Sequence, residues 1–483
     1  MPTLNVKWGR EKYTVDANTE DPPFVFKSQL FALTGVQPDR QKLVIKGKIL
    51  PDESWEGIAI AEGLTIMMMG SADAIPQAPV LTSEDQSGQG QKAKELPMPL
   101  GLKNLGNTCY MNSVLQSLQT IPELSECLEK YSGADDNQST RLLKSLRETF
   151  RFMQNKNPSS LIPMSILFNL HAQFPQFATV GERGEPQQQD ANECFTELLR
   201  VVLSGIKGIK PTGWDASIES FFRGKYSVEL KNMENPDEPA QNSHEDFYQL
   251  SCFLSQEVKY VQTGLKEKLT EEIEKHSPSL DRNAKYQKKI TIDRLPAYVS
   301  VQMVRFFYKE NVGTNAKILK DVKFPLVLDL HDLCTPKLQE RCRPHRDAFK
   351  ADEDAKLERL RRKKLEDPAT REDDGEPLPF SFEDDPGSNN SAFYELQAVI
   401  THKGRSSDSG HYVAWVRIKG DKWAMCDDDE VHEITSQEVL KLSGGGDWHT
   451  AYVLLYGPRI CHKDKAEAEE NVEAQNVATT MES

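Results

Sequence analysis

The sequence predicts an α+β protein with a small N-terminal domain, a flexible linker and a much larger second domain. In the large domain, helix-like patterns come first and strand-like runs dominate after residue 220. Residues 1–70 combine strand-like runs with one helix-like stretch that follows the first two of them. Between the two domains, residues 71–96 are rich in Pro, Gly, Ser and Gln and have no apolar periodicity, which is typical of a flexible linker.

The small domain is predicted from short, well-separated patterns. Two strand-like runs, LNVKW and KYTV, flank a turn at Gly9-Arg10. Apolar residues at helical spacing follow and stop at Gly35, a residue that commonly ends helices. The run QKLVIKGKIL predicts a hairpin with Gly47 at its turn, and LTIMMM predicts a last short strand.

The large domain is expected to span residues 97–459. Helical patterns continue to about residue 210, and the strand-like runs that follow extend to the end of the domain. A charged stretch at about 345–390 interrupts the strands and predicts a surface helix followed by a polar, solvated loop. Residues 460–483 are charged and poor in apolar residues, so they are predicted to be a disordered tail.

Composition excludes several classes of function. The chain carries 59 Lys and Arg against 74 Asp and Glu, for a net charge of −15, and has no dense basic patch, so nucleic acid is not expected as a ligand. No run approaches the ~18 apolar residues of a membrane span, so no transmembrane segment is expected. The N-terminus lacks the apolar stretch of a signal peptide, and the eight cysteines form no CxxC pair. These features predict a reduced protein of the cytoplasm or the nucleus.

The strongest chemical motif is NLGNTCYMN at residues 104–112. Its glycine and asparagines favour a tight turn, and apolar residues at helical spacing follow, so Cys109 is expected at a helix N-terminus. The positive end of the helix dipole favours the thiolate over a thiol that ordinarily titrates near ~8.5. Asn104 is a candidate donor for an oxyanion. For an isolated cysteine the alternative is a buried structural thiol, but the surrounding motif favours a nucleophile.

A second motif, SGHYVAW at residues 409–415, supplies a candidate base. His411 begins a strand of alternating pattern, and Gly410 permits a close approach of the backbone. A histidine here could also be an ordinary strand residue. A nucleophilic cysteine and its histidine are usually distant in sequence and are brought together by the fold.

A third motif, WAMCDDD at residues 423–429, supplies a candidate acid. The stretch RIKGDK at 417–422 predicts a hairpin turn, so the strand that begins with His411 and the strand that ends at Asp427 should be antiparallel neighbours. A carboxylate beside His411 would fix its tautomer and stabilise its cation. Asp427 is the chosen acid, Asp428 is the alternative, and a solvated turn of three aspartates is the simplest reading.

These three motifs, in this order, resemble the ubiquitin-specific protease family. GLKNLGNTCYMNSVLQ matches the family's Cys box, and residues 394–456 match its His box. Between them, QQQDANE at 187–193 resembles a Gln-Gln-Asp motif, with Asn192 where the family often has His. The resemblance covers residues 97–459 and implies a papain-like domain with thumb, palm and fingers.

The resemblance implies a role for each site residue. The catalytic set comprises Cys109 as nucleophile, His411 as general base, Asp427 as orienting acid and Asn104 as oxyanion donor. Gln189 and Asp190 are expected beside the substrate channel, although Asp190 is also a good N-cap for the helix that follows. Ser409 and Gly410, also expected to contact substrate, end the polar segment 404–410, which is either a movable gate or a simple hairpin loop.

The small domain resembles a ubiquitin-like domain of the β-grasp fold, above all in QKLVIKGKIL. No Gly-Gly follows Met69, so we expect this domain to dock rather than to be conjugated. Val44 is the candidate docking residue, and a half-buried strand valine is the alternative. A ubiquitin-like domain linked to this catalytic domain resembles a proteasome-associated member of the family. That resemblance implies docking on the proteasome regulatory particle and trimming of ubiquitin chains.

The predicted reaction is hydrolysis of the isopeptide or peptide bond after the C-terminal glycine of ubiquitin, with ubiquitin and polyubiquitinated proteins as partners. No cofactor is expected. Many family members bind zinc in the fingers through CxxC pairs, but none occurs here, so we predict no metal and fingers held by packing alone. The alternative functions are a noncatalytic ubiquitin-binding scaffold and a protease for a ubiquitin-like modifier.

Overall fold

The computed structural model describes residues 2–8, 11–17, 41–45, 48–51, 63–69, 98–133, 137–154, 160–181, 184–309, 314–363, 376–406, 409–446 and 448–463, with a few single positions between 19 and 60. The chain forms two compact units, Met1–Ala93 and Lys94–Ser483, and each is described by itself. The predicted linker at 71–96 and the tail beyond residue 463 lie outside the described residues.

The first unit contains a five-stranded sheet in the order β2-β1-β5-β3-β4. The predicted hairpin is confirmed by the antiparallel pairing of β3 with β4, and β1 runs parallel to β5. The predicted turns at Gly9-Arg10 and Gly47 and the helix end at Gly35 fall outside the described residues. The strands are β1 Thr3–Trp8, β2 Glu11–Asp16, β3 Lys42–Ile45, β4 Lys48–Ile49 and β5 Thr65–Met69.

The two faces of this small sheet differ. Leu43 and Ile45 on β3 are buried in the core of the unit, whereas Val44 between them is only half-buried. Successive side chains of a strand point to opposite faces, so Val44 lies on the outer face. Met67, its partner on β5, has 54% of its surface exposed. Val44 and Met67 therefore form an accessible apolar pair on the outer face.

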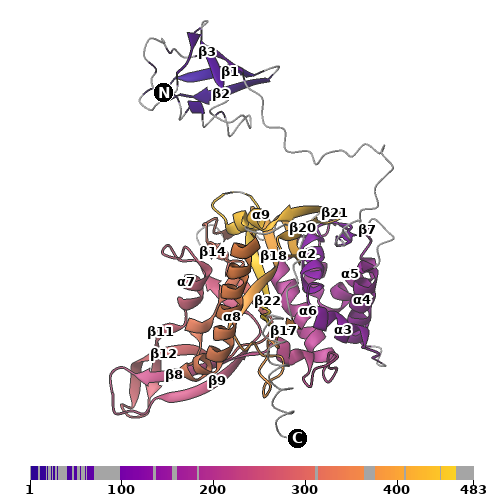
Figure 1. Cartoon of the computed structure of the whole chain (residues 1–483), viewed down its shortest axis with the longest axis vertical. Coiled ribbons are helices and arrows are strands. Elements are labelled where there is room, and N and C mark those ends of the chain that lie inside the picture. Colours follow the sequence, from indigo (N-terminus) through magenta and orange to yellow (C-terminus); the bar gives the residue numbers. More distant parts are fainter. Residues whose placement is uncertain are drawn as a thin grey trace. The chain divides into compact units, whose positions relative to one another are not determined.

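The second unit confirms the predicted α+β order, with helices first and strands later (Figure 1). The helices between residues 109 and 205 gather in one layer on one side of the main sheet, and the strands of the two largest sheets of this unit begin after residue 220. The helices of this layer are α2 Cys109–Leu118, α3 Pro122–Glu129, α4 Gln138–Met153, α5 Met164–Gln173 and α6 Ala191–Gly205.

An eight-stranded sheet separates two hydrophobic cores. Alternate residues of its strand β19 enter different cores: Tyr412 and Ala414 pack with the helical layer, while Val413 and Trp415 pack on the other face. The strands follow the order β10-β13-β22-β18-β19-β20-β21, with β16 paired to β18. Their bounds are β10 Leu250–Phe253, β13 Val299–Val304, β16 Val327–Asp329, β18 Phe393–Ser406, β19 Ser409–Lys419, β20 Lys422–Asp427, β21 Glu430–Thr435 and β22 Thr450–Pro458.

A second sheet, in the order β11-β12-β8-β9, forms the fingers (Figure 1). The expectation that packing alone holds them is wrong. The Glu238 carboxylate accepts hydrogen bonds from Asn232 (2.8 Å), Ser277 (2.6 Å) and the Tyr286 hydroxyl (2.5 Å), and also from Ser279. A polar hub therefore joins the ends of three strands. The strands are β8 Gly224–Asn232, β9 Gln241–Phe247, β11 Thr270–Ser277 and β12 Arg282–Arg294.

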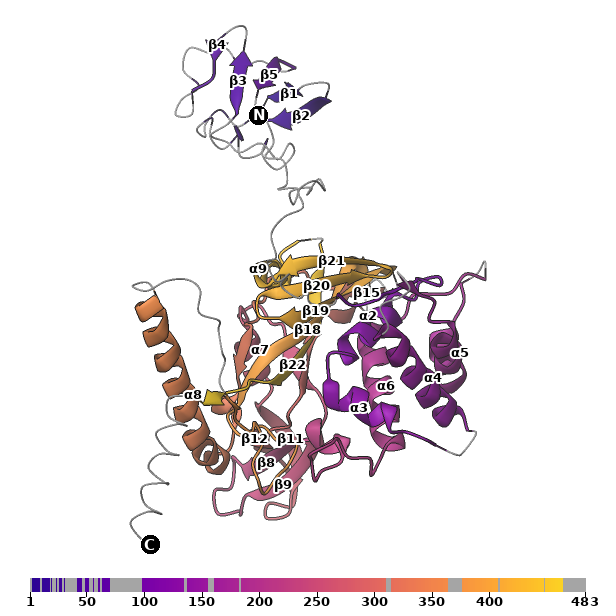
Figure 2. The same ribbon diagram turned by 45° about the vertical axis from the view of Figure 1, so that its right-hand side comes forward.

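The charged insertion differs from its prediction in two ways. Its helix, α8 Pro336–Lys363, begins before residue 345 and contains Pro344 (Figure 2). Residues 388–390, expected in a solvated loop, are buried, and the Asn389 and Asn390 side chains donate to backbone carbonyls. The predicted disordered tail also begins later than residue 460, since β23 His462–Lys463 pairs with β17 Glu376–Pro377.

The remaining elements are short. They are β6 Gly101–Leu102, β7 Ser160–Leu161, α7 Val261–Lys266, β14 Phe306–Lys309, β15 Thr314–Lys317 and α9 Ser436–Leu440, with 3-10 turns at Pro175–Ala178, Ile218–Phe221, His331–Leu333 and Lys441–Ser443.

Arg305, just after β13, is fully buried, and no carboxylate among the described residues forms an ion pair with it. Its guanidinium donates to the backbone carbonyls of Ile318 (3.0 Å), Lys320 (2.8 Å), Ser443 (2.8 Å) and Ala451 (2.7 Å). Burial lowers the pKa of Arg305 to about 10, so the group stays charged at neutral pH. These bonds fix both ends of the segment between Ser443 and Ala451.

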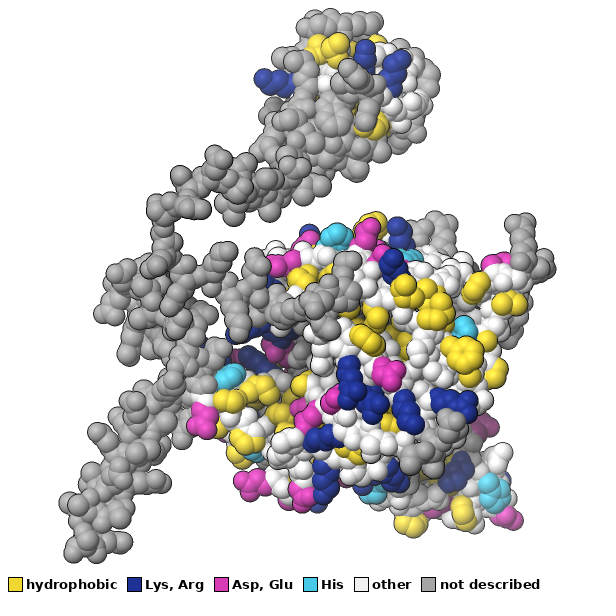
Figure 3. Space-filling model, turned by 90° about the vertical axis from the view of Figure 1, so that its right-hand side faces the viewer, with side chains coloured by type: hydrophobic (Ala, Val, Ile, Leu, Met, Phe, Trp, Pro, Cys, Tyr) yellow, Lys and Arg dark blue, Asp and Glu magenta, His cyan; other side chains and the backbone are white. Residues whose placement is uncertain are grey.

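The outer face of the helical layer carries exposed apolar side chains (Figure 3). They include Phe152 at the end of α4, Ile162 before α5, and Met164 and Phe168 on α5. Across the part of the chain that is described, no helix is both long and apolar enough to cross a membrane.

Candidate active site

Cys109 is the first residue of α2, where the sequence predicts it. The preceding turn contains Gly106 and Asn107, both at positive φ (97° and 53°), which glycine and asparagine adopt most readily. No side chain caps the helix, so its first backbone N–H groups are not occupied by a capping residue. Cys109 itself is only 2% exposed. Cys109 therefore stands at the positive end of the helix dipole.

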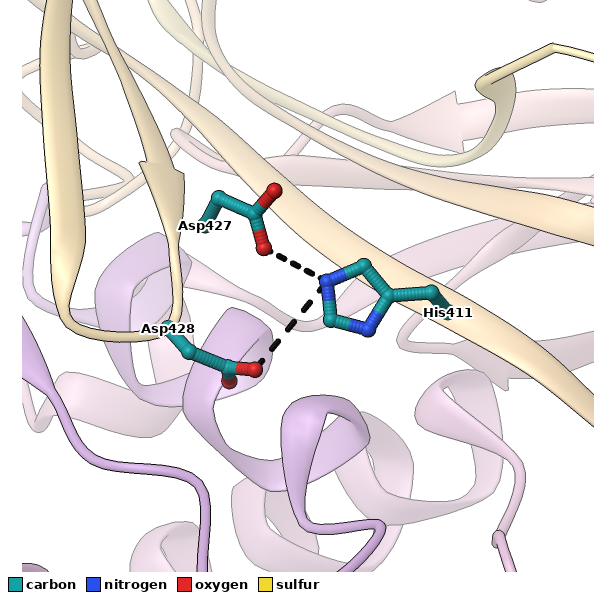
Figure 4. Close-up of side chains that lie close together, drawn as sticks. All are labelled: His411, Asp427 and Asp428. Atoms are coloured by element: carbon teal, nitrogen blue, oxygen red, sulfur yellow. Dashed lines mark hydrogen bonds and ion pairs between the residues drawn. The ribbon is translucent and has the colours of Figure 1, made fainter.

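His411 and Asp427 meet across the predicted hairpin. Strands β19 and β20 are antiparallel, and His411 Nε2 donates to Asp427 Oδ1 over 2.5 Å. Asp428 lies farther from the ring, with its Oδ2 atom 4.0 Å from the same nitrogen (Figure 4). Of the two candidate acids, the geometry therefore assigns the imidazole to Asp427.

The environment of His411 favours its protonated form. Its pKa is raised to about 10, first by the hydrogen bond with Asp427, then by the one with Cys109, against an opposing effect of burial. The same contact with His411 lowers the pKa of Asp427. Because Nε2 is occupied by Asp427, Nδ1 is the ring atom that remains for the thiol. The arrangement suits a thiolate–imidazolium pair held by a carboxylate.

Asp428 has a separate task, which the sequence did not reveal. It accepts hydrogen bonds from the side-chain amides of Asn104 (2.9 Å) and Asn112 (2.8 Å). Asn104 Oδ1 in turn accepts from the backbone N–H groups of Gly106 (2.9 Å) and Thr108 (3.2 Å). An amide nitrogen carries two hydrogens, so Asn104 retains one for an oxyanion. Asn112 stands in the Cys motif, but nothing in the sequence pairs it with Asp428.

Gln189 and Asp190 take different positions. Gln189 lines a polar hollow of about 460 Å³ with Asn107 of the Cys turn, and it donates to Thr179 over 2.6 Å. Asp190 is the N-cap of α6, as the simpler reading predicts, and its second oxygen accepts from the Tyr452 hydroxyl over 2.6 Å. Both oxygens of Asp190 are thus engaged within the protein.

Ser409 and Gly410 are exposed at the start of β19. Gly410 has φ of +134°, and a side chain there would meet the backbone of Lys403 and lie 2.6 Å from the His402 ring nitrogen. Only glycine suits this place. Ser407 and Asp408, at the tip of the predicted gate, lie outside the described residues.

The active-site acids already have partners. Within the described residues, His411, Asp427 and Asp428 have potential metal-ligand atoms within 4.8 Å of one another. However, Asp427 is bonded to His411, and Asp428 to Asn104 and Asn112. The group is therefore arranged as a hydrogen-bonded acid–base cluster.

Comparison with known families divides the chain in the same way. The profile described as ubiquitin carboxyl-terminal hydrolase matches residues 100–456, and the one described as ubiquitin family matches residues 4–73.

Individual proteins are similar over nearly the whole chain. Ubiquitin carboxyl-terminal hydrolase 14 of Caenorhabditis elegans is 45% identical over 472 residues, covering 95% of this chain and 94% of that protein. Ubiquitin carboxyl-terminal hydrolase 6 of Arabidopsis thaliana is 38% identical, covering 95% of this chain and 99% of that protein. A solved structure, the SAGA Ubp8/Sgf11/Sus1/Sgf73 DUB module bound to ubiquitin aldehyde, shares the fold at 18% identity, with a TM-score of 0.52 over 74% of this chain and 69% of that one.

Proposed function

Because this chain belongs to the ubiquitin carboxyl-terminal hydrolase family and is thus an enzyme of the deubiquitinase class, we propose that Cys109, His411 and Asp427 hydrolyse the bond after ubiquitin's C-terminal glycine. The observation that carries these assignments is the hydrogen bond between His411 and Asp427, and the contribution of Cys109 to the raised pKa of His411 supports the thiol as its second partner. The position of Cys109 at the start of α2 supports its role as nucleophile.

The proposed reaction has two steps. The Cys109 thiolate attacks the glycine carbonyl, and the C–N bond breaks as His411 donates its proton to the leaving lysine amine. Water then attacks the thioester while His411 accepts a proton, which releases the ubiquitin carboxylate and the free thiolate. In both steps the remaining amide hydrogen of Asn104 stabilises the oxyanion. Gln189, Asp190, Ser409 and Gly410 are proposed to contact the ubiquitin tail.

We also propose that the ubiquitin-like domain docks on the proteasome regulatory particle, where the enzyme is activated and trims ubiquitin chains from substrates. The accessible pair Val44 and Met67 supports this, because exposed apolar side chains on a small sheet suit a protein contact. The proposed location is the cytoplasm or the nucleus. All eight cysteines are free thiols, which suits a reducing compartment.

Labelling with ubiquitin that carries a C-terminal electrophile tests the nucleophile. We expect one adduct, at Cys109, which Cys109→Ser abolishes and Cys127→Ser, a matched change at another buried thiol, preserves. No adduct, even with proteasomes present, would favour the noncatalytic scaffold. Faster labelling by an electrophile built on a ubiquitin-like modifier would indicate that the enzyme is a protease for that modifier rather than for ubiquitin.

Turnover of a fluorogenic ubiquitin C-terminal amide, with and without proteasomes, tests docking. We expect proteasomes to raise the rate, and Val44→Asp to remove most of that increase. Lys42→Ala, on the same strand, is the control. Equal rates with and without proteasomes would contradict activation by docking and the gate at 404–410.

A further inference from the structure

The polar hollow beside the Cys turn contains an amide that lacks a partner. Gln188 lines this hollow, which has a volume of about 460 Å³, and only 8% of the residue's surface is exposed. Its side-chain nitrogen, Nε2, has no hydrogen-bond partner among the described residues. Buried polar atoms are nearly always paired, so an unpaired amide in the wall of a cavity points to a ligand that would satisfy it.

The walls of the hollow are already in place. One wall is Asn107 of the Cys turn, and the other is made of Thr179 and residues 185–189. The Asn107 side chain donates to the Pro186 carbonyl over 2.8 Å, which joins the two walls. In the second wall, the Gln187 backbone N–H donates to the Thr179 carbonyl over 3.0 Å. A ligand would therefore bind without the entropic cost of ordering these groups.

The hollow adjoins the proposed nucleophile. Asn107 precedes Cys109 by two residues, and consecutive Cα atoms lie about 3.8 Å apart, so the two Cα atoms are within about 7.6 Å of each other. In an isopeptide substrate, the leaving lysine is joined through the end of its side chain. The backbone around that lysine therefore lies one side-chain length from the bond that breaks. A site for this backbone must be near Cys109 without containing it, and the hollow meets both conditions.

Amide side chains dominate the lining, and they belong to Asn107, Gln187, Gln188 and Gln189. Gln189 uses both of its amide hydrogens, because it donates to the Thr179 hydroxyl (2.6 Å) and to the Gln187 carbonyl (3.1 Å), whereas Gln188 uses neither. A side-chain amide offers the same kinds of donor and acceptor as a peptide group. The lining is therefore complementary to the backbone of a polypeptide, whatever its sequence.

Two polypeptides meet in the proposed reaction, and their chemistry distinguishes them. The C-terminal Gly-Gly of ubiquitin has no side chains and suits a narrow channel. The polypeptide that carries the modified lysine has side chains before and after that lysine, so it needs a wider site. A hollow of about 460 Å³ lined by amides fits the second polypeptide.

We infer that the polar hollow binds the polypeptide that carries the modified lysine, with the Gln188 amide donating to one of its backbone carbonyls. This inference rests on the proposed function and deepens it, because it gives the leaving half of the substrate a site of its own. Since the contacts are with the backbone, substrates that differ in sequence around the lysine are expected to bind equally well.

Three variants of the full-length chain test the inference. Gln188→Leu removes the unpaired amide at similar volume, and Gln187→Ala removes an exposed amide from the lining. Gln176→Leu is the matched control, at an exposed glutamine outside the lining. Each variant is assayed with two substrates: ubiquitin joined to the lysine of a labelled peptide, and ubiquitin with a fluorogenic C-terminal amide. The second substrate has no polypeptide on its leaving side.

We expect Gln188→Leu to raise KM for the peptide-linked substrate about 10-fold, because a carbonyl of the peptide would be buried without a donor. Its kcat for this substrate, and both constants for the fluorogenic amide, should stay within about twofold of wild type. Its melting temperature should not fall, because the amide has no partner in the free enzyme. Gln187→Ala should raise KM for the peptide-linked substrate about threefold, and a peptide of scrambled sequence around the lysine should leave the wild-type KM unchanged.

An equal rise in KM for both substrates would overturn the inference, because the Gln188 amide would then bind the ubiquitin tail. An unchanged KM for the peptide-linked substrate in Gln188→Leu would also overturn it. If Gln188→Leu does not fold, an unchanged KM in Gln187→Ala has the same consequence. The proposed function fails on a different result: wild type that hydrolyses neither substrate, or Cys109→Ala that hydrolyses both, would refute it.

Discussion

Asn104 donates its side-chain amide to Asp428 over 2.9 Å, although the two residues are 324 positions apart in the chain. The next residue back, Asp427, holds His411 at 2.5 Å. Two consecutive aspartates therefore serve different partners: one is bonded to His411, the proposed base, and the other to Asn104, the proposed oxyanion donor. Asp428 can do this because its φ of +52° turns it away from the strand that ends at Asp427.

Asp428→Ala is expected to lower kcat about 100-fold, the scale of losing one oxyanion donor, with KM within about threefold. The reason is that Asn104 would lose the partner that aims its amide. Steady-state kinetics with the fluorogenic amide measure the effect. Asp429→Ala, at the exposed neighbour, is the control and should match wild type. A normal kcat in Asp428→Ala would show that Asn104 is held by its other contacts.

Asp427→Asn should narrow the pH range of activity. The carboxylate is the main cause of the high pKa of His411, about 10, so an amide there lowers that pKa. The alkaline limb of kcat/KM should move to lower pH, and kcat should fall at least about 100-fold. A pH profile from 5 to 10 records both changes. If Asp427→Asn loses activity but its alkaline limb of kcat/KM stays at the wild-type pH, a group other than His411 determines that limb.

Stability should depend on pH through the same pair. The folded pKa of His411 is raised, so its contribution is complete below the ordinary value of about 6.5 and is lost as pH rises toward 10. The pKa of Asp427 is lowered, so its contribution is lost in acid, as pH falls below its ordinary value of about 3.9. The stability difference between wild type and His411→Gln should be largest between about pH 4 and 6.5. Urea unfolding of wild type and His411→Gln at pH 6 and pH 9 measures this difference. An equal difference at the two pH values would contradict the predicted coupling between protonation of His411 and folding.

The fingers should withstand chelators and depend on one carboxylate. Treatment with EDTA is expected to leave the melting temperature and kcat/KM unchanged, because Glu238 joins the strand ends without a metal. Glu238→Ala should instead increase hydrogen exchange in β8 and β12, with Asp237→Ala as the exposed control. If Glu238→Ala leaves hydrogen exchange in β8 and β12 unchanged, packing alone is sufficient to hold the fingers.

Gly410→Ala should reduce activity more than 10-fold, since strain and collision with Lys403 and His402 displace the residue before His411. Gly420→Asn is the matched control, because φ is +59° there, nothing lies within 4 Å, and asparagine tolerates this conformation. Fluorogenic turnover and the melting temperature report the two variants. If Gly410→Ala and Gly420→Asn have the same turnover and melting temperature, the backbone at Gly410 tolerates a side chain.

Local patterns were sufficient to predict where the candidate catalytic residues lie. Cys109 at a helix start and His411 beside Asp427 across a hairpin follow from turn chemistry and strand pairing, both of which act over short stretches. The choice between Asp427 and Asp428 needed the backbone conformation at the strand end. The partner of Asn104 could not be predicted, because a hydrogen bond between residues 324 positions apart produces no local sequence pattern.

In two other regions, the polar and charged residues led to predictions that the structure corrects. The charged stretch predicts a helix within about 345–390, yet α8 begins at Pro336 and continues through Pro344. The Ser-Asn run at 388–391 suggested solvent, but its amides replace water by bonding to the backbone. In the fingers, the absence of CxxC pairs predicts packing alone, and no motif in the sequence marks Glu238. Its donors lie 6 to 48 residues away and converge only in the folded chain.

Arg305 holds the carbonyls of Ser443 and Ala451, so the stretch between them behaves as an arc with fixed ends. The distance that such a stretch can span is limited by the number of its residues, each covering at most about 3.6 Å. Gly444 and Gly445, both at positive φ, follow the Ser443 end, and the Gly445 N–H donates to the Leu319 carbonyl over 2.8 Å. A single residue inserted or deleted between these anchors would therefore shift one of them.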